Sequence, residues 1–552
     1  MRLKIVSILF TVFLIFIHSS CVNSCNGKNK RKAISADQSL YSPINYNLIF
    51  LDSAKIAHVF QEDSSLAEFA PEMRDFYLKR EYQFAWFNED GVSTSLAQLY
   101  QMINLHILNF QDSTLYDKVL MPVIDSLTAD PKYLKKNMHQ QVDWEVKFTG
   151  YFFKYAKKEF NGIDKDPKDL EWFIPRKKKD FKLLLEKIAC CEKEMEEYEP
   201  VNPFYKNFKK SLIEYRQIAD SADSLQIFAH KLKNDKESLP QIKKLLYLMK
   251  DLPTRDTSEE WSEELSTAIE NFQMRMGLHP NCELDAPTLA ELNVPIIDRI
   301  KQIIINMERL RWMPDSVSND YILVNIASFT FYVFEQGKLV WQMPVVVGKS
   351  ATSTTIFSGS LSHIVFSPYW NIPKSILVNE ILPKVKRNPS YIDKHNMQVL
   401  IGNQVISAYS IPWNNYSDKV PLTVRQKPGP ENALGQVKFL FPNAYNIYFH
   451  DTPQKNLFKE HNRAFSHGCI RLSDPSRLAR YLLRDSPEYT NEKLESLMSN
   501  NVETWIKLKT NIPVYLCYFT AWRYSDGSTQ FRRDIYNHDK KLEKEVFSNY
   551  LF

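Results

Sequence analysis

The sequence predicts a multidomain α+β protein with a mostly helical N-terminal half and a strand-rich C-terminal half. Its 552 residues correspond to about three to four domains of ordinary size. Apolar residues recur at three- and four-residue steps up to about residue 250, and at every second residue from about residue 315. Hydrophobic residues make up 44% of the chain and charged residues 24%, which excludes disordered, collagen-like and multi-span membrane proteins.

Charge and composition exclude further classes of function. The formal net charge is +5, from 70 basic and 65 acidic residues, so we expect no nucleic-acid partner. Glycine is scarce, with 13 residues, and neither a P-loop nor a dinucleotide-binding fingerprint is present. The seven cysteines are odd in number and too few for a disulfide scaffold.

Residues 1–21 predict export from the cytoplasm. Two basic residues precede the apolar run Ile5–Ile17, which is typical of a secretory signal and too short to span a membrane comfortably. Small residues before Cys21 resemble a bacterial lipobox, although His18 stands where leucine is usual. A lipoprotein with a lipidated Cys21, an ordinary cleaved signal and an uncleaved anchor all remain open. Residues 22–39 are polar and basic and predict a tether, so we expect membrane contact only through this end, in a bacterial envelope or periplasm.

Residues 40–250 predict a helical scaffold domain without catalytic signals. The doublet Cys190-Cys191 lies on an expected helix and is interpreted as buried and inert. The three- and four-residue periodicity predicts helices over Ser64–Arg80, Gln140–Phe160, Lys177–Glu197, Tyr205–Ala219 and Ile242–Leu252.

Residues 251–296 predict a second, smaller helical unit. Gly277 is suited to a left-handed cap at the end of one helix, and Asp285 is suited to capping the start of the next. The string AIENFQMRMGLHPNCELDAPTLAELN resembles the small three-helix peptidoglycan-binding domain. A generic helical hairpin is the alternative, and glycan binding by this unit is left open.

Residues 297–552 predict a strand-rich domain with a long insertion. The insertion, about 373–435, is rich in Pro, Asn and Lys, and such a stretch inside a compact domain predicts a lid or binding loop. The alternating pattern predicts strands over Tyr321–Ile326, Phe329–Phe334, Leu339–Val347, Leu361–Phe366, Lys438–Leu440, Asn446–His450 and Val514–Thr520.

The densest chemistry lies between residues 448 and 475, which hold His450, Asp451, His461, His467 and Cys469. A thiol becomes a nucleophile when a nearby imidazole takes its proton. Gly468, between His467 and Cys469, permits a tight turn whose backbone amides could converge as an oxyanion hole. A zinc site built from these five residues is one alternative, and a structural cluster with a buried cysteine is another.

Fifteen residues separate His450 from Ser466, and Ser-His-Gly-Cys follows at 466–469. This pattern resembles the L,D-transpeptidases of bacterial cell walls, and the resemblance implies a catalytic domain of mixed β-sandwich character with a lid. Other segments resemble the large multidomain branch of that family: FYLKREYQFAWFNEDG at 76–91, EWFIP at 171–175, NMERLRWMP at 306–314, VVVGK at 345–349, PYWNIP at 368–373 and PVYLCYFTAWRYSDGSTQFRRDIY at 513–536.

The resemblance implies roles for particular residues. Cys469 would be the nucleophile and His450 the proton donor and acceptor, while His467 and Gly468 would support the oxyanion hole with the amide of the cysteine itself. Arg471 stands where the wider family usually has Asn, and it would either hold a substrate carboxylate or tie down the loop. Further substrate-binding candidates are Ser466, Tyr448, Trp370 and Asn371.

The implied reaction is acyl transfer between peptidoglycan stems during cell-wall biogenesis. A cysteine thiolate would attack a tetrapeptide stem and release D-alanine, and an amine of a neighbouring stem would then form a 3→3 cross-link. Stem peptides and glycan would be the partners, and neither a metal nor an organic cofactor is expected. The alternatives are an L,D-carboxypeptidase that uses water, a catalytically decayed wall-binding scaffold and a zinc peptidase.

Overall fold

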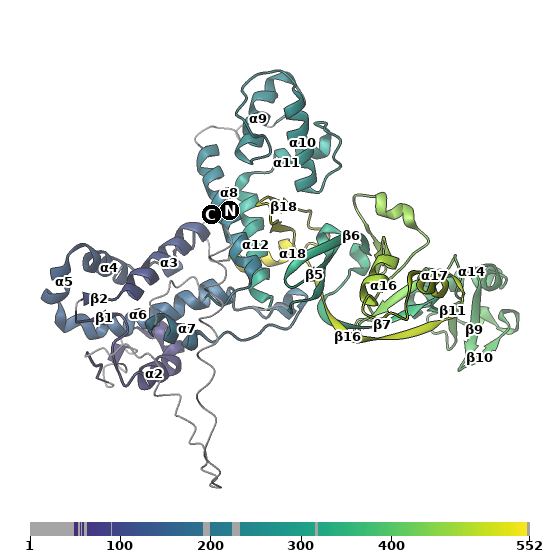
Figure 1. The fold of residues 1–552 in the computed structure, drawn as a ribbon, viewed down its shortest axis with the longest axis horizontal. Helices are drawn as coiled ribbons and strands as arrows, with labels where there is room; N and C mark the ends of the chain where they lie inside the picture. Colours follow the sequence, from purple (N-terminus) through teal and green to yellow (C-terminus); the bar gives the residue numbers. More distant parts are fainter. Residues whose placement is uncertain are drawn as a thin grey trace, which may run out of the picture. The chain divides into compact units, whose positions relative to one another are not determined.

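The computed structural model of the chain describes residues 49–52, 56, 58, 59, 63–89, 91–190, 199–223, 232–314 and 318–548. The predicted signal, lipobox and tether lie outside these residues, as do Cys21 and Cys191. Residues 47–552 form one compact unit (Figure 1). Within the described ranges, no helix has both the length and the apolar character needed to cross a membrane.

The N-terminal part of this unit is helical, as predicted. The helix expected over Ser64–Arg80 is divided in two near Pro71, and the helix expected over Gln140–Phe160 ends in a π-helical turn. Three further helices, α3 to α5, were not predicted. The elements are η2 (Ser64–Phe69), α2 (Ala70–Lys79), α3 (Thr94–Phe110), α4 (Leu120–Ala129), α5 (Pro131–Lys136), α6 (Gln141–Ala156), η5 (Lys157–Asn161) and α7 (Phe181–Cys190).

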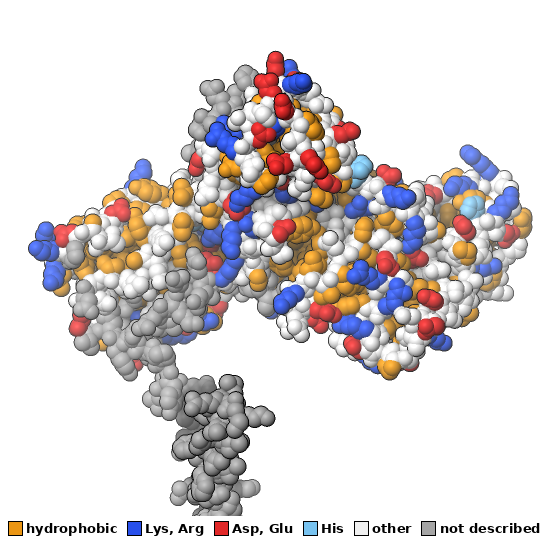
Figure 2. All heavy atoms as spheres, turned by 45° about the horizontal axis from the view of Figure 1, so that its top comes forward, with side chains coloured by type: hydrophobic (Ala, Val, Ile, Leu, Met, Phe, Trp, Pro, Cys, Tyr) orange, Lys and Arg blue, Asp and Glu red, His pale blue; other side chains and the backbone are white. Residues whose placement is uncertain are grey.

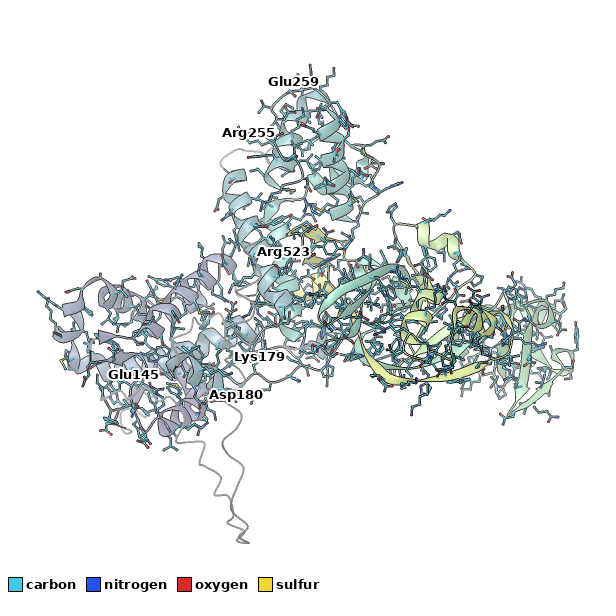
Figure 3. All side chains as sticks on the ribbon, viewed as in Figure 1. Glu145, Lys179, Asp180, Arg255, Glu259 and Arg523 are labelled. Carbon is cyan, nitrogen blue, oxygen red and sulfur yellow. The ribbon has the colours of Figure 1, made fainter. Side chains whose placement is uncertain are left out.

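Glu145 on α6 ties the core of this helical part together (Figure 3). One of its carboxylate oxygens accepts a hydrogen bond from the Ala85 amide at 2.6 Å, and the other accepts one from the Trp86 amide at 3.0 Å. The Tyr77 hydroxyl donates a third at 3.0 Å. Because Glu145 is fully buried, no water molecule can take the place of its carboxylate as the acceptor of these hydrogen bonds.

Replacing Glu145 with alanine is expected to destabilise the helical part by about 3 kcal/mol, since it leaves the backbone amides of Ala85 and Trp86 buried without their acceptor. Urea denaturation followed by tryptophan fluorescence would measure the loss. Glu186→Ala is the control, because Glu186 makes only a half-exposed pair with Lys79 and should change stability by less than about 1 kcal/mol. Equal effects of the two substitutions would contradict the role assigned to Glu145.

The next helices are α8 (Pro203–Asp223), α9 (Leu239–Leu248), α10 (Glu263–Met276), α11 (Ala286–Leu292) and α12 (Ile296–Trp312). Both predicted caps are confirmed. Gly277 ends α10 in a left-handed conformation with φ of 68°, and Asp285 accepts a hydrogen bond from the Thr288 amide at 2.9 Å at the start of α11. The boundaries of the small unit stay predictions.

The C-terminal strands form one sheet that closes on itself. Its order is β12-β13-β15-β6-β5-β4-β16-β7, and β12 also pairs with β7. The prediction of a strand-rich domain is confirmed. The predicted β-sandwich is wrong, because β12 and β7, which would be the two edges of an open sheet, are hydrogen-bonded to each other. The strands are β4 (Tyr321–Asn325), β5 (Thr330–Glu335), β6 (Lys338–Gly348), β7 (Ile356–Phe366), β12 (Val437–Leu440), β13 (Phe449–His450), β15 (Ile470–Leu472) and β16 (Thr504–Cys517).

The insertion is a small folded body with its own sheet, of order β10-β9-β11-β8, and its own apolar core around Leu377, Val385, Val399 and Val424. It is therefore more than a loop, and its role as a lid stays a prediction. Its elements are β8 (Trp370–Asn371), α13 (Lys374–Ile376), η11 (Leu377–Ile381), α14 (Leu382–Arg387), α15 (Tyr391–Lys394), β9 (Met397–Ile401), β10 (Gln404–Ile406) and β11 (Thr423–Gln426).

Segments distant in sequence join the helical part to the strand-rich part. Strand β3 (Trp172–Phe173) pairs in parallel with β7. Arg523, labelled in Figure 3 and lying on β17 (Ala521–Arg523), makes two hydrogen bonds to the Glu214 carboxylate of α8, at 2.7 and 3.1 Å. On the face shown in Figure 2, acidic and basic side chains are interspersed.

Candidate active site

Two short neighbouring strands bring His450 and the Cys469 segment together. Strand β13 pairs in parallel with β15, so that His450 lies beside Arg471, and Cys469 comes directly before β15. Phe449 and Ile470 belong to the apolar core inside the closed sheet. Because side chains alternate along a strand, His450 and Arg471 point to the opposite, outer face.

His450 has one of its two ring nitrogens engaged by the backbone. Its Nδ1 lies 2.5 Å from the carbonyl oxygen of Asp451, and since a carbonyl can only accept, Nδ1 carries the proton and donates it. The lone pair is therefore on Nε2. Burial lowers the pKa of His450 to about 3, and the nearby charge of Arg471 adds to this effect. The imidazole is thus neutral at physiological pH and suited to accept a proton.

Cys469 is partly exposed, and its thiol faces a backbone carbonyl. The Sγ atom donates to the Asn446 oxygen at 3.6 Å. Burial raises the pKa of the Cys469 thiol, while Tyr448 and the charge of Arg471 act in the opposite direction. The thiol therefore rests in its protonated form and needs a base to become a nucleophile.

The turn before Cys469 is held by Ser466. The serine hydroxyl donates to the carbonyl of Cys469 at 2.6 Å and accepts from the Gly468 amide at 3.1 Å. Ser466 is only 2% exposed and positions the turn through these two contacts, while its predicted contact with substrate stays a prediction. Because the Gly468 amide is already engaged, the amides of His467 and Cys469 are the better candidates for an oxyanion hole.

Gly468 adopts a backbone conformation that this turn requires and that other residues rarely adopt. Its φ is 114°, a value that residues with a side chain rarely adopt. Thr354 fixes the glycine further by donating from its hydroxyl to the Gly468 carbonyl at 2.8 Å.

Arg471 is a cation without an acidic partner among the described residues. Its Nη1 donates to the neutral amide oxygen of Gln454 at 2.6 Å. Its Nε is buried and has no hydrogen-bond partner there. The guanidinium group therefore keeps donors available for an anion.

The remaining predicted residues lie at different distances from this centre. The Tyr448 ring is 5.7 Å from the His450 ring, centroid to centroid. Trp370 and Asn371 lie on β8 of the insertion, where the tryptophan packs partly against the insertion's core. From the same insertion, Glu380 of η11 reaches back to His467, with 2.9 Å between the carboxylate oxygen and Nε2.

The side chains that the zinc alternative required have other partners. Asp451 pairs with Lys455 at 2.6 Å, and the exposed His461 ring stacks on His279 at 4.8 Å. His467 faces Glu380 instead. Over the described ranges, no group of three or more His, Cys, Asp or Glu side chains is arranged to hold a metal ion.

Two family matches fall on the two halves of the described chain. Residues 319–540 match YkuD, the L,D-transpeptidase catalytic domain, and residues 71–212 match the Scaffold domain. The chain therefore contains an L,D-transpeptidase catalytic domain and a Scaffold domain. It is 34% identical over 279 residues to a protein of Haemophilus influenzae whose name assigns it provisionally to the L,D-transpeptidases. That match covers 50% of this chain and 55% of the relative, so the chain spans about half the length of that relative.

Solved structures of L,D-transpeptidases are more distant. The enzyme from Stackebrandtia nassauensis is 14% identical, with 52% of this chain and 94% of that chain covered and a TM-score of 0.21. The enzyme from Mycobacterium smegmatis is 16% identical, with 36% and 58% covered and a TM-score of 0.18.

Several residues around the catalytic-domain motif were missed by sequence reasoning. Thr354 and Asn446 touch the motif through hydrogen bonds from segments that carry no signature of their own. Gln454 follows His450 closely in sequence and meets Arg471 only through the pairing of β13 with β15. No spacing rule links any of these residues to Cys469, so only the folded sheet identifies them.

Proposed function

We propose that this protein is a peptidoglycan L,D-transpeptidase that forms 3→3 cross-links through a Cys469 thioester. The observation that supports this most is the neutral His450, whose proton is on Nδ1 and whose lone pair is on Nε2, on the strand next to the Ser-His-Gly-Cys turn. That pair supplies the base and the nucleophile that acyl transfer from an amide requires.

The first half of the reaction forms the thioester. His450 Nε2 takes the thiol proton, and the sulfur attacks the carbonyl carbon of the diamino acid in a tetrapeptide stem. The amides of His467 and Cys469 stabilise the negative oxygen of the tetrahedral intermediate. The carbon–nitrogen bond then breaks, the imidazolium returns its proton to the nitrogen, and D-alanine leaves.

The second half transfers the acyl group. An amine of a neighbouring stem attacks the thioester carbon, gives a proton through His450 to the departing sulfur, and forms the new peptide bond. Water in place of the amine would make the protein an L,D-carboxypeptidase. In this scheme Arg471 holds a carboxylate of the donor stem, while Tyr448, Trp370 and Asn371 contact the peptide and the insertion covers it.

The location proposed for this reaction is the bacterial periplasm, where stem peptides and glycan are found. The N-terminal residues would anchor the protein there through lipidated Cys21 or an uncleaved signal. Labelling cells with a radioactive fatty acid would test the lipid, since Cys21→Ala should remove the label. A label that persists in this variant would contradict the anchor.

Incubating the purified protein with tetrapeptide muropeptides tests the proposed function. Liquid chromatography with mass spectrometry should show cross-linked dimers together with an equal amount of D-alanine. D-Alanine without dimers would identify a carboxypeptidase, and tight binding to sacculi without any product would identify a binding scaffold. Iodoacetamide should abolish turnover and a chelator should not, whereas a zinc peptidase would respond in the opposite way.

Gly468→Ala is expected to lower the rate of D-alanine release about tenfold or more. The nearest atoms to an added Cβ are backbone oxygens at 3.8 Å, so space is sufficient, but the φ of 114° strains the turn by about 1–3 kcal/mol. Gly402→Ala is the matched control, because that glycine also has a positive φ, of 58°, with open space around it and a position in the insertion's hairpin. Equal rates for the two variants would contradict the role of the turn.

A further inference from the structure

Lys438 lies beside His450 in the closed sheet and has no role in the scheme above. Strand β12 pairs with β13 so that Lys438 is directly opposite His450, and β13 pairs with β15 so that His450 is beside Arg471. The residues before and after Lys438, Val437 and Phe439, belong to the inner core. Lys438, His450 and Arg471 therefore form one row across three strands, all on the outer face.

The row places a cation on each side of the base. The Lys438 side chain is only 12% exposed, and burial lowers its pKa. Its closest carboxylate oxygen, Oε1 of Glu503, is 3.9 Å away and already accepts the Tyr369 amide at 2.9 Å. The Lys438 ammonium group also lies over the Trp505 ring, 5.4 Å from its centroid, and the described residues give it no hydrogen bond.

Two further cations, Lys455 and Arg471, lie near His450, and only the charge of Lys455 is compensated. Lys455 is 2.6 Å from Asp451, which neutralises it. Arg471, by contrast, has only the neutral Gln454 and a buried Nε without an acceptor. Lys438 has one long ion pair and a ring contact, and Arg471 has no acidic partner among the described residues, so an anion bound in this partly buried row would be stabilised. Lys438 and Arg471 are therefore suited to an anion that arrives with the substrate.

The chemistry of the leaving group indicates which anion this is. His450 must reach the nitrogen of the departing D-alanine in order to protonate it, and a single α-carbon separates that nitrogen from the terminal carboxylate. The carboxylate therefore enters the space next to His450, which the two cations flank. An amidated or extended terminus would lack the negative charge at this point.

We infer that Lys438 and Arg471 form a subsite for the terminal carboxylate of the donor stem, one on each side of His450. This inference rests on the proposed function for the identity of the donor. It assigns to Lys438 a role in specificity: the site selects stems that end in a free D-amino acid.

Binding measured without turnover tests the subsite. In the Cys469→Ala protein, isothermal titration calorimetry compares a tetrapeptide ending in D-alanine with the same peptide ending in D-alaninamide. The free acid should bind about tenfold more tightly, as expected for a charge-assisted contact. Adding Lys438→Met should bring the acid to the affinity of the amide and leave the amide unchanged, whereas Lys438→Arg should keep the preference.

Lys459→Met is the control, because Lys459 is an exposed lysine on the nearby η14 (Lys455–Lys459) and its removal should alter neither affinity. Equal binding of acid and amide to the Cys469→Ala protein would overturn the subsite, and this comparison does not depend on how Lys438→Met folds. An equal loss for both peptides in Lys438→Met would also overturn it. A preference for the acid without D-alanine release by the unmodified protein would instead contradict the proposed function alone.

Discussion

Cys469→Ala is expected to reduce D-alanine release from tetrapeptide stems by about four orders of magnitude or more. The reaction forms a covalent bond to the sulfur, so no other group can substitute for it, and removing a nucleophile is among the largest single effects known in enzymes. Release of D-alanine from muropeptides, followed by mass spectrometry, measures the change.

Cys282→Ala provides the control for this prediction. Cys282 is a free and partly exposed thiol in the small helical unit, so its removal should leave the rate unchanged. Mass spectrometry of a β-lactam or substrate adduct should place the added mass on Cys469. Equal release by the unmodified protein and Cys469→Ala, or an adduct on another residue, would refute the nucleophile.

His450→Asn is expected to lower kcat/KM by about 100- to 10,000-fold, the usual contribution of a general base. Asparagine can still donate to the Asp451 carbonyl, so the strand should remain in place while the proton acceptor at Nε2 is lost. His461→Asn is the matched control, since that ring is exposed and stacks on His279 away from the thiol. A similar loss in both variants would contradict the base assignment.

The pH profile follows from the same histidine. A pKa of about 3 keeps His450 neutral over most of the acidic range, and protonation would inactivate the base only below that value. Activity should therefore persist through pH 5 rather than fall near pH 6.5, the ordinary value for histidine. A rate that halves near pH 6.5 and tracks His450 in NMR titration would show that the imidazole is not held neutral in this way.

The sequence by itself predicted several of the helices and strands, and it was enough to propose His450 and Cys469 as a catalytic pair. The helical periodicity predicted α8, and the caps at Gly277 and Asp285 were readable because helix ends need particular residue types. His450 and Cys469 could be proposed because the family pattern places them at a fixed spacing. These signals involve residues that are close together in the chain, so they can be recognised from the sequence alone.

Only the tertiary structure decided how the strands close and what surrounds the base. The pairing of β12 with both β13 and β7 joins segments separated by the whole insertion, so alternation alone could not distinguish a sandwich from a closed sheet. The same pairing sets Lys438 opposite His450, which no sequence motif links. Burial keeps His450 neutral, and Arg471 has no acidic partner among the described residues, because charge and desolvation depend on neighbours in space rather than along the chain.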